Sequence, residues 1–218
     1  MKTRLVPVLA VLIVLGVLGV LSTPGAFADP AKDGVRQCFL SYKHALLAKD
    51  GDKAVAVLSA NSLDYYDRMR KLALTGSRQE VQALADLDRM SVFSLRVRTP
   101  RSLLETGSPG ALVKYAIDSG MIGADSVSRM DIGEITVRGD QATADIMGNG
   151  QSLGTFRFHK EGDAWKFDLE ALIQLAQGRL SALAKQQGMD ENELLIKLLS
   201  QVTGKEIGEE IWKPLVQR

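Results

Sequence analysis

The middle of the chain alternates hydrophobic and polar residues, which is the pattern of β-strands that bury one face. The segment 134–146 (EITVRGDQATADI) alternates on both sides of Gly139-Asp140, and Asn149-Gly150 follows a few residues later. Such dipeptides between alternating runs are strong signals for tight hairpin loops. A third turn is expected at 161–163 (Glu-Gly-Asp). These signals predict a four-stranded antiparallel meander from about Met130 to Leu169.

The last two expected strands carry the largest apolar side chains of this region. Phe156 and Phe158 alternate with polar residues on one strand, and Trp165, Phe167 and Leu169 do so on the next. With a side-chain period of two, these groups share one face of the sheet. A sheet with one apolar face must be covered, and the helices before it are the available cover. We therefore expect an α+β fold in which amino-terminal helices pack on the meander.

The segments before the strands have the spacing of amphipathic helices. Val35, Phe39, Tyr42 and Leu46 recur at helical intervals, and Gly51 ends that helix. Further helices are expected over 52–59 and 61–74. Another is expected to begin at a capping box over 77–80. Two more are expected at Pro100 and Pro109, because proline is favoured at the first position of a helix. The apolar stripe that continues from the capping box consists of Val81, Leu84, Leu87 and Met90.

The carboxyl-terminal part is also expected to be helical. Asp168 can cap one helix over 169–187, and Asp190 can cap the next. Ile207, Ile211 and Leu215 then repeat every four residues beside Trp212. We expect one cone-like α+β domain over 29–169, with residues 170–218 packed on it as helices. The alternative is a helical arm that binds a partner or forms a homodimer.

The first 28 residues have the features of a secretory signal peptide. Lys2 and Arg4 precede an apolar run from Leu5 to Leu21, and residues 26–28 (AFA) supply the small side chains that a signal peptidase requires. Cleavage after Ala28 predicts an exported protein, periplasmic or extracellular, without stable membrane insertion. A segment that is retained as an amino-terminal anchor is the alternative.

The net charge limits the classes of partner to be expected, and the cysteine content limits the covalent cross-links. Removing Lys2 and Arg4 lowers the number of basic side chains from 27 to 25, against 26 acidic ones, so the expected mature chain has a formal charge of −1. This near-balance argues against nucleic acid as a partner and gives no reason to expect attraction to anionic lipid. Cys38 is the only cysteine, which excludes an intramolecular disulfide, and its neighbours on a helix face predict a buried, unreactive thiol.

The residues best suited to chemistry are few. His44 and His159 are expected to face solvent, on the polar sides of a helix and a strand. No zinc-ligand spacing and no phosphate-binding loop occur in the sequence, so we expect no metal and no cofactor. The segment 96–101 (RVRTPR) is a basic cluster. It can receive an anionic ligand or partner, or it can consist of solvated arginines at a helix end.

The richest polar cluster is 63–71 (LDYYDRMRK). In a pocket wall, Asp64 can act as a base while Tyr65 or Tyr66 donates a hydrogen bond. The alternative is a solvated helix face that is stabilised by ion pairs four residues apart. The two expected pairs are Asp64–Arg68 and Asp67–Lys71.

This order of elements resembles the nuclear-transport-factor-2-like superfamily, in particular its exported bacterial members of unassigned function. The matching stretches are 35–59 (VRQCFLSYKHALLAKDGDKAVAVLS), 135–146 (ITVRGDQATADI) and 154–169 (GTFRFHKEGDAWKFDL). The resemblance implies a curved, cone-like sheet wrapped around helices, often with a cavity inside. Members include isomerases, dehydratases, scaffolds and ligand-binding subunits. Residues 99–123 and those after Ala171 extend beyond the usual small cone.

Three functions are compatible with these patterns. The leading hypothesis is an exported, non-enzymatic binding protein that holds a small hydrophobic ligand or a protein partner. The second is a cofactor-independent isomerase, dehydratase or hydrolase in the same cavity, with Asp64 and Tyr65 as candidate catalytic residues. The third is a structural module that dimerises. The side chains expected at the ligand site are Tyr42, Tyr66, Phe156, Phe158, Trp165 and Phe167.

Overall fold

The computed structural model describes residues 29–123 and 127–216. The expected signal peptide, residues 1–28, lies outside these described residues. Among the helices within them, none has both the length and the apolar character that a bilayer crossing requires. The fold is α+β, with one open four-stranded antiparallel sheet between two groups of helices along the chain.

The sheet is the predicted meander. Its strands are β1 (Asp131–Arg138), β2 (Gln141–Gly148), β3 (Gln151–Glu161) and β4 (Ala164–Asp168), hydrogen-bonded in the order β1-β2-β3-β4. The three predicted turns join them, and Asn149 and Gly150 have φ values of 51° and 77°. Two successive positive φ values are what a type I′ hairpin loop requires, which explains the asparagine-glycine sequence there.

The helices are more numerous than the sequence pattern predicts, because two of the predicted helices are divided. Those before the sheet are α1 (Pro30–Leu47), α2 (Gly51–Ala56), α3 (Ala60–Thr75), α4 (Arg78–Gln82), α5 (Asp86–Arg98), α6 (Arg101–Thr106) and α7 (Pro109–Asp118). Those after it are α8 (Leu169–Ala176), α9 (Arg179–Gln187), α10 (Glu191–Thr203) and the 3-10 helix η2 (Glu209–Trp212).

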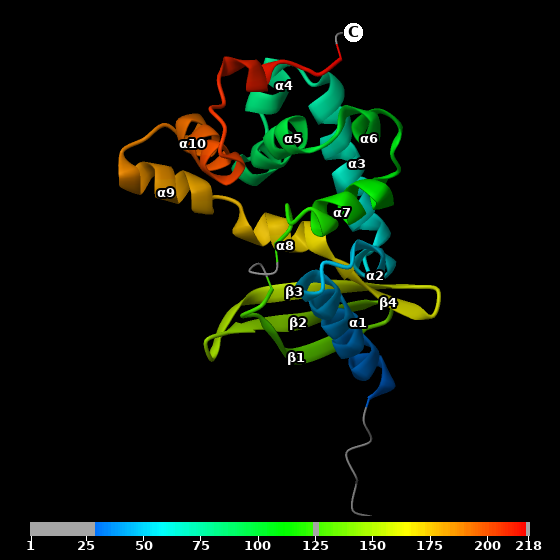
Figure 1. Ribbon diagram of the computed structural model, residues 1–218. Coiled ribbons are helices and arrows are strands. Elements are labelled where there is room, and N and C mark those ends of the chain that lie inside the picture. The colour runs from blue at the N-terminus through cyan, green and yellow to red at the C-terminus, as the bar shows by residue number, and fades with distance from the viewer. Residues whose placement is uncertain (1–28, 124–126, 217–218) are drawn as a thin grey trace, which may run out of the picture.

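One face of the sheet carries the aromatic side chains, and α1 lies across it (Figure 1). The ring centroids of Phe39 and Phe156 are 4.7 Å apart, and those of Tyr42 and Phe167 are 4.9 Å apart. Trp165 lies against the first turns of α1, where a Cβ on Gly34 would come within 2.7 Å of the indole ring. The predicted common aromatic face is therefore confirmed.

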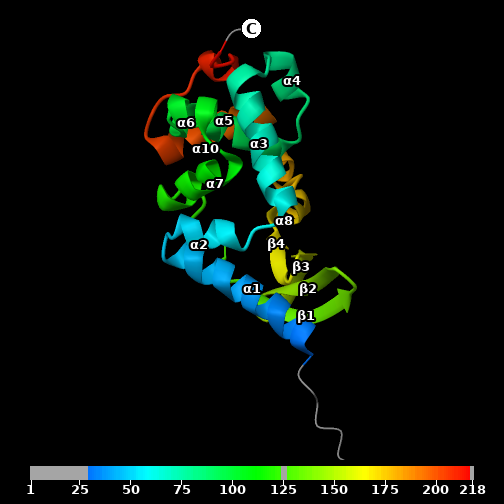
Figure 2. The same cartoon turned by 90° about the vertical axis from the view of Figure 1, so that its right-hand side faces the viewer.

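Buried side chains form two clusters rather than one. The first joins α1, α2 and the sheet and includes the aromatic face. The second joins α3, α5, α10 and the end of the chain, and in it the rings of Phe93 and Trp212 meet edge to face at 4.8 Å. Figure 2 shows the result as two layers, with α1 and the sheet at one end of the molecule and α4, α5, α6 and α10 at the other.

Two of the chain crossings between these layers, from α2 into α3 and from β4 into α8, are hydrogen-bonded to each other. The segment before α3 runs parallel to β4, so that the Ser59 N–H donates to the Phe167 carbonyl (2.9 Å) and the Phe167 N–H donates to the Val57 carbonyl (2.8 Å). The Ser62 hydroxyl donates to the Phe167 carbonyl (3.2 Å) and accepts from the Leu169 N–H (2.8 Å). Ser59 and Ser62 are fully buried. We call these hydrogen-bonded crossings, formed by residues 57–62 and 167–169, the seam. The seam fixes the start of α3 to the start of α8.

Two predicted helices are divided in the structure. The helix predicted over 169–187 is broken at Gly178, which has a φ of 80°. The Asp86 carboxylate, at the start of α5, accepts hydrogen bonds from the N–H groups of Gly178 (3.1 Å) and Ser181 (3.3 Å) and thereby caps α9. The stripe expected to continue from Ser77 is likewise divided between α4 and α5. The Ser77–Glu80 capping box itself is present.

We predict that Phe156→Ala lowers the free energy of unfolding by about 3–5 kcal/mol, because it removes a buried ring and leaves a cavity against Phe39 and Phe167. Leu153→Ala, on the same strand, is the control. Leu153 is 47% exposed, so its truncation should cost less than about 1 kcal/mol. Urea unfolding monitored by circular dichroism gives both values, and equal costs would contradict the assignment of the core face.

Candidate functional site: an apolar cleft between the layers

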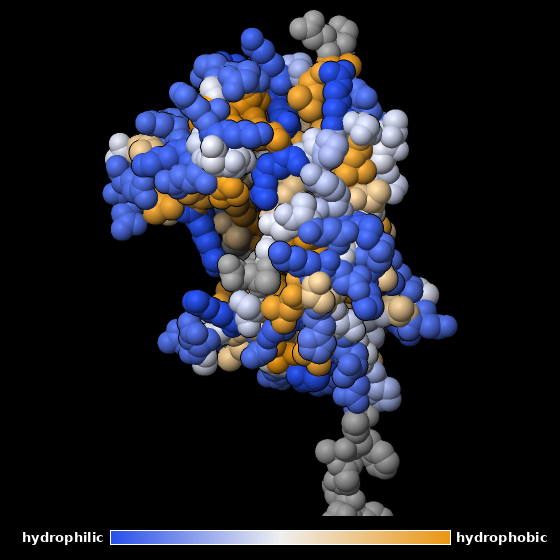
Figure 3. All heavy atoms as spheres, in the orientation of Figure 1, coloured by the Kyte–Doolittle hydropathy of each residue, from blue (hydrophilic) through white to orange (hydrophobic). Residues whose placement is uncertain are grey.

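An apolar cleft of about 210 Å³ lies where the two layers meet. Its walls come from α3, α5, α7, α8 and the segment after α7. Figure 3 shows hydrophobic side chains inside a hollow in the side of the molecule, between the level of α9 and α10 and the level of the sheet. The cleft is lined by Tyr66, Leu87, Met90, Ser91, Ser94, Leu95, Arg98, Leu112, Ala116, Met121, Ile122 and Ile173.

One face of α5 supplies half of this lining. From Leu87 to Arg98 each member has another member three or four residues away, which places them all on one side of the helix. The face is apolar at its start and acquires hydroxyl groups and a guanidinium toward its end. The Ser91 hydroxyl is engaged, since it donates to the Leu87 carbonyl (2.9 Å) and lies 3.2 Å from the Tyr65 hydroxyl.

The end of α5 is tied to the opposite wall of the cleft. The Tyr115 hydroxyl of α7 donates to the Arg98 carbonyl (3.0 Å). The hydroxyl of Thr99 lies 4.0 Å from the sulfur of Met121, and Thr99 is buried. These contacts hold the α5 terminus, α7 and the segment after α7 in one arrangement, so the backbone at Arg98 has a fixed position beside the cleft.

The basic cluster at 96–101 is divided among three environments. Arg96 is buried, and its guanidinium donates to four carbonyl oxygens, those of Leu72, Ala73, Gly76 and Ile211, at 2.7–3.1 Å. Burial lowers the pKa of Arg96 to about 10, which leaves it charged near neutral pH. Arg101 forms a surface ion pair with Glu105 (2.7 Å). Arg98 is the member of the cluster that lines the cleft.

The structure separates the side chains that were expected to share a ligand site. Tyr42, Phe156, Phe158 and Phe167 are buried among one another in the sheet-side core, and Trp165 packs beside them partly exposed. Tyr66 lines the cleft between the layers. Burial raises the pKa of the Tyr66 hydroxyl, which therefore stays neutral at physiological pH. Arg98, also in the lining, belongs to the basic cluster that was considered for an anionic ligand or partner. The remaining members of the lining were not candidates in the sequence, although the stripe containing Leu87 and Met90 was a visible signal.

Asp64 and Tyr65, the candidate catalytic residues, are not brought together. Asp64 is exposed, and Arg68, its expected partner, binds Glu170 of α8 instead (2.7 Å). The Tyr65 hydroxyl donates to the Asp88 carboxylate (2.9 Å), and burial raises its pKa. The second expected pair, Asp67–Lys71, is present at 2.8 Å. A catalytic role for Asp64 and Tyr65 stays a prediction.

Other reactive groups lie away from the cleft. His44 is exposed, as predicted, and His159 is paired with the Asp168 carboxylate (3.1 Å) on the outer face of the sheet. Cys38 is buried beside the Val57 carbonyl, and burial raises the pKa of its thiol to about 12. Across the described residues, histidine, cysteine and acidic side chains form no group of three that is placed to hold a metal ion.

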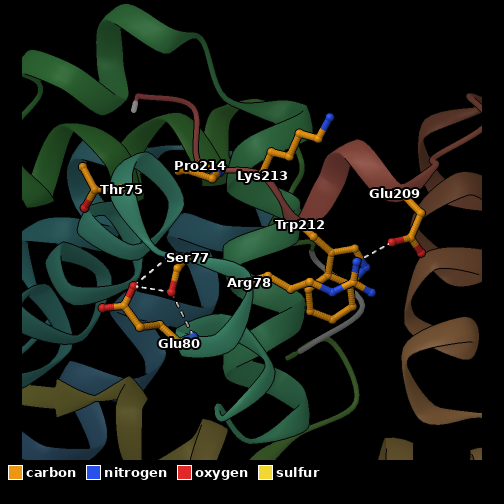
Figure 4. Close-up of a pocket in the computed structure, with 8 residues that line it drawn as sticks. All are labelled: Thr75, Ser77, Arg78, Glu80, Glu209, Trp212, Lys213 and Pro214. Atoms are coloured by element: carbon orange, nitrogen blue, oxygen red, sulfur yellow. Dashed lines mark hydrogen bonds and ion pairs between the residues drawn. The ribbon is translucent and has the colours of Figure 1, made fainter. Parts of the chain in front are cut away.

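A wider hollow of about 650 Å³ lies near the end of the chain, but two of its charged side chains, Arg78 and Glu209, are paired with each other. Arg78 lies over the Trp212 ring, 4.9 Å from its centroid, and donates to the Glu209 carboxylate (2.6 Å). Glu80 is turned back to Ser77, and Lys213 extends away from the hollow (Figure 4). These contacts fasten the chain end to α4, which makes a structural role the better account of this region.

Comparison of the chain with family models, with curated proteins and with solved structures finds no match. The resemblance to the nuclear-transport-factor-2-like superfamily therefore stays a prediction. The geometry of the cleft is the basis on which a function can be proposed.

We predict that Arg96→Met lowers the free energy of unfolding by about 3–5 kcal/mol, because it leaves buried carbonyl oxygens without a donor. Arg101→Met is the matched control in the same segment. Its surface ion pair should contribute no more than about 1 kcal/mol. Denaturant midpoints measure both variants, and a mild effect of Arg96→Met would show that the guanidinium does not hold α3 and η2 together.

We predict that Cys38 of the native protein reacts with a maleimide at pH 8 on the order of a thousandfold more slowly than Cys38 of the urea-unfolded chain. A thiol with a pKa of about 12 has very little thiolate at that pH, whereas an ordinary cysteine has a substantial fraction. Mass spectrometry of timed samples gives both rates. Comparable rates in the two states would place the thiol at the surface.

Proposed function

We propose that this protein is an exported, non-enzymatic binding protein that holds a small hydrophobic ligand in the cleft between its two layers. The observation that supports this most directly is the lining, which is an apolar cavity with few polar side chains: Ser91, Ser94 and Arg98 of α5 and Tyr66 of α3. Ligand sites in proteins are typically concave, mostly apolar and equipped with a small number of orienting polar groups.

The volume of the cleft indicates the size of the ligand. A void of about 150 Å³ holds a benzene-sized molecule, and drug-sized ligands occupy roughly 300–1,000 Å³. A cleft of about 210 Å³ lies between these limits. The favoured occupant is therefore a compound with one ring or a short chain, rather than a long acyl chain.

The proposal differs from the resemblance in where the ligand lies. A cone-like member of the superfamily would hold its ligand against the concave face of the sheet. In this chain the aromatic groups of that face are packed against Phe39 and Tyr42 of α1. The cleft is instead bordered by α8, which follows β4 directly, so the sheet supports the site without lining it. The cone-like shape of the sheet stays a prediction that follows from the resemblance.

The first experiment is native mass spectrometry of protein purified from its own host, followed by titration with neutral compounds such as indole. We expect one equivalent to bind with a Kd of about 1 mM or tighter. Ala116→Leu extends a side chain into the cleft and should weaken binding at least tenfold with little effect on the melting temperature.

The control is Ala182→Leu, the same change at an exposed position on α9. It should leave indole binding unchanged, because α9 does not line the cleft. Absence of binding by the wild-type protein, or an affinity that Ala116→Leu does not alter, would contradict the proposal.

A further inference from the structure

Arg98 is a cation at an apolar site, and no acidic side chain among residues 29–123 and 127–216 is paired with it. It is the charged member of the lining, and it makes no ion pair with any residue that the structure describes. Its side chain is partly buried, so part of its hydration has already been removed. An unpaired charge next to an apolar cavity is costly unless something compensates it.

The acidic residues of the surrounding helices do not provide that compensation. Asp88 lies ten residues earlier on α5, about 15 Å along the helix axis, and accepts from Tyr65 and Gln177. Asp118 of α7 binds Lys114 (3.0 Å), and Glu170 of α8 binds Arg68 (2.7 Å). Each of these three carboxylates thus has a partner of its own.

A second polar group stands one helical turn before Arg98. Ser94 also lines the cleft, four residues earlier on the same face of α5, where side chains are about 5–6 Å apart at Cβ. Long helical side chains lean toward the amino terminus of their helix, which brings the Arg98 guanidinium toward Ser94. In the described part of the chain the Ser94 hydroxyl has no hydrogen-bond partner, unlike that of Ser91.

A cation at the carboxyl end of a helix is also favoured by the helix dipole, which is a purely structural reason for Arg98. That reason applies to any orientation of the side chain and would be satisfied by a guanidinium in open solvent. It does not explain why Arg98 lines the cleft, nor why a free hydroxyl faces the same cavity one turn away.

We propose that the ligand is an amphipathic carboxylate, whose apolar part fills the cleft while its carboxylate is held between the Arg98 guanidinium and the Ser94 hydroxyl. Arginine presents a planar fork that matches a carboxylate, and such charge-assisted hydrogen bonds are stronger than neutral ones. This inference rests on the proposed function, because it assigns the polar end of the same site.

The test compares 3-phenylpropanoate with 3-phenylpropanol, which share the apolar part and differ in charge. Wild-type protein should bind the carboxylate about 10- to 100-fold more tightly than the alcohol, as measured by titration calorimetry. Arg98→Gln should remove this preference while leaving the affinity for the alcohol within about threefold. Ser94→Ala should reduce the preference in part, and Arg98→Lys should restore some of it.

Arg101→Gln is the matched control, since it removes a nearby arginine that is engaged with Glu105 and does not line the cleft. It should leave the preference unchanged. Melting temperatures show that each variant is folded, and Arg98→Met, which also removes the charge, serves in place of Arg98→Gln if the latter does not fold.

The two proposals fail in different ways. Equal affinities of the wild-type protein for the acid and the alcohol would overturn the carboxylate site and leave the apolar cleft standing. A preference that survives both Arg98→Gln and Arg98→Lys would place the anion elsewhere and would also overturn the inference. If neither compound binds, the ligand-binding function fails, and the carboxylate site fails with it.

Discussion

The seam between the two layers is the constraint on which the rest of the structure depends. At this point the chain leaves the sheet side twice, once into α3 and once from β4 into α8. The buried Ser62 hydroxyl, which also lies 3.0 Å from the Ser59 hydroxyl, joins the two crossings. A buried polar group without a partner is costly, so these hydroxyls and the Phe167 and Leu169 backbone must keep one geometry. The cleft exists because α3 and α8 leave the seam in different directions and the gap between them is filled only in part.

The helical layer is held together to an unusual degree by charged side chains that bind backbone groups of other elements. Arg96 binds carbonyl oxygens at the end of α3 and in η2, and Asp86 binds N–H groups at the start of α9. Short helices leave many backbone groups unsatisfied at their ends, and these side chains supply the missing partners. Several charges in this layer are therefore committed to structure, which is why Arg98, whose side chain has no such partner among the residues that the structure describes, is informative.

Local signals were sufficient for much of the sheet. Gly139-Asp140 and Asn149-Gly150 specify their turns through conformations that few other residues adopt, and alternation then places Phe156 and Phe158 on one face. Asp168 caps α8 as expected, because a cap needs only neighbouring residues.

What could not be predicted depends on contacts between distant parts of the chain. Gly178 was a visible breaker within the predicted helix, but the break is stabilised by Asp86, which lies 92 residues earlier. The division into two cores has no local signature, because stripes of α3 and α1 look alike in sequence while they pack on different partners. The same applies to the arginines of 96–101, whose three roles are decided by where α5 ends relative to α7 and η2.

The two ends of the described chain lie at opposite poles of the molecule (Figure 1). Pro30 begins α1 at the sheet end, while Val216 is bound through its N–H to the Leu74 carbonyl (2.9 Å) at the far end of the helical layer. If the chain is attached to a surface ahead of Pro30, the sheet lies nearest to that surface and the helical layer lies farthest from it. The mouth of the cleft, on the flank between the poles, would then remain open to whatever diffuses past that surface.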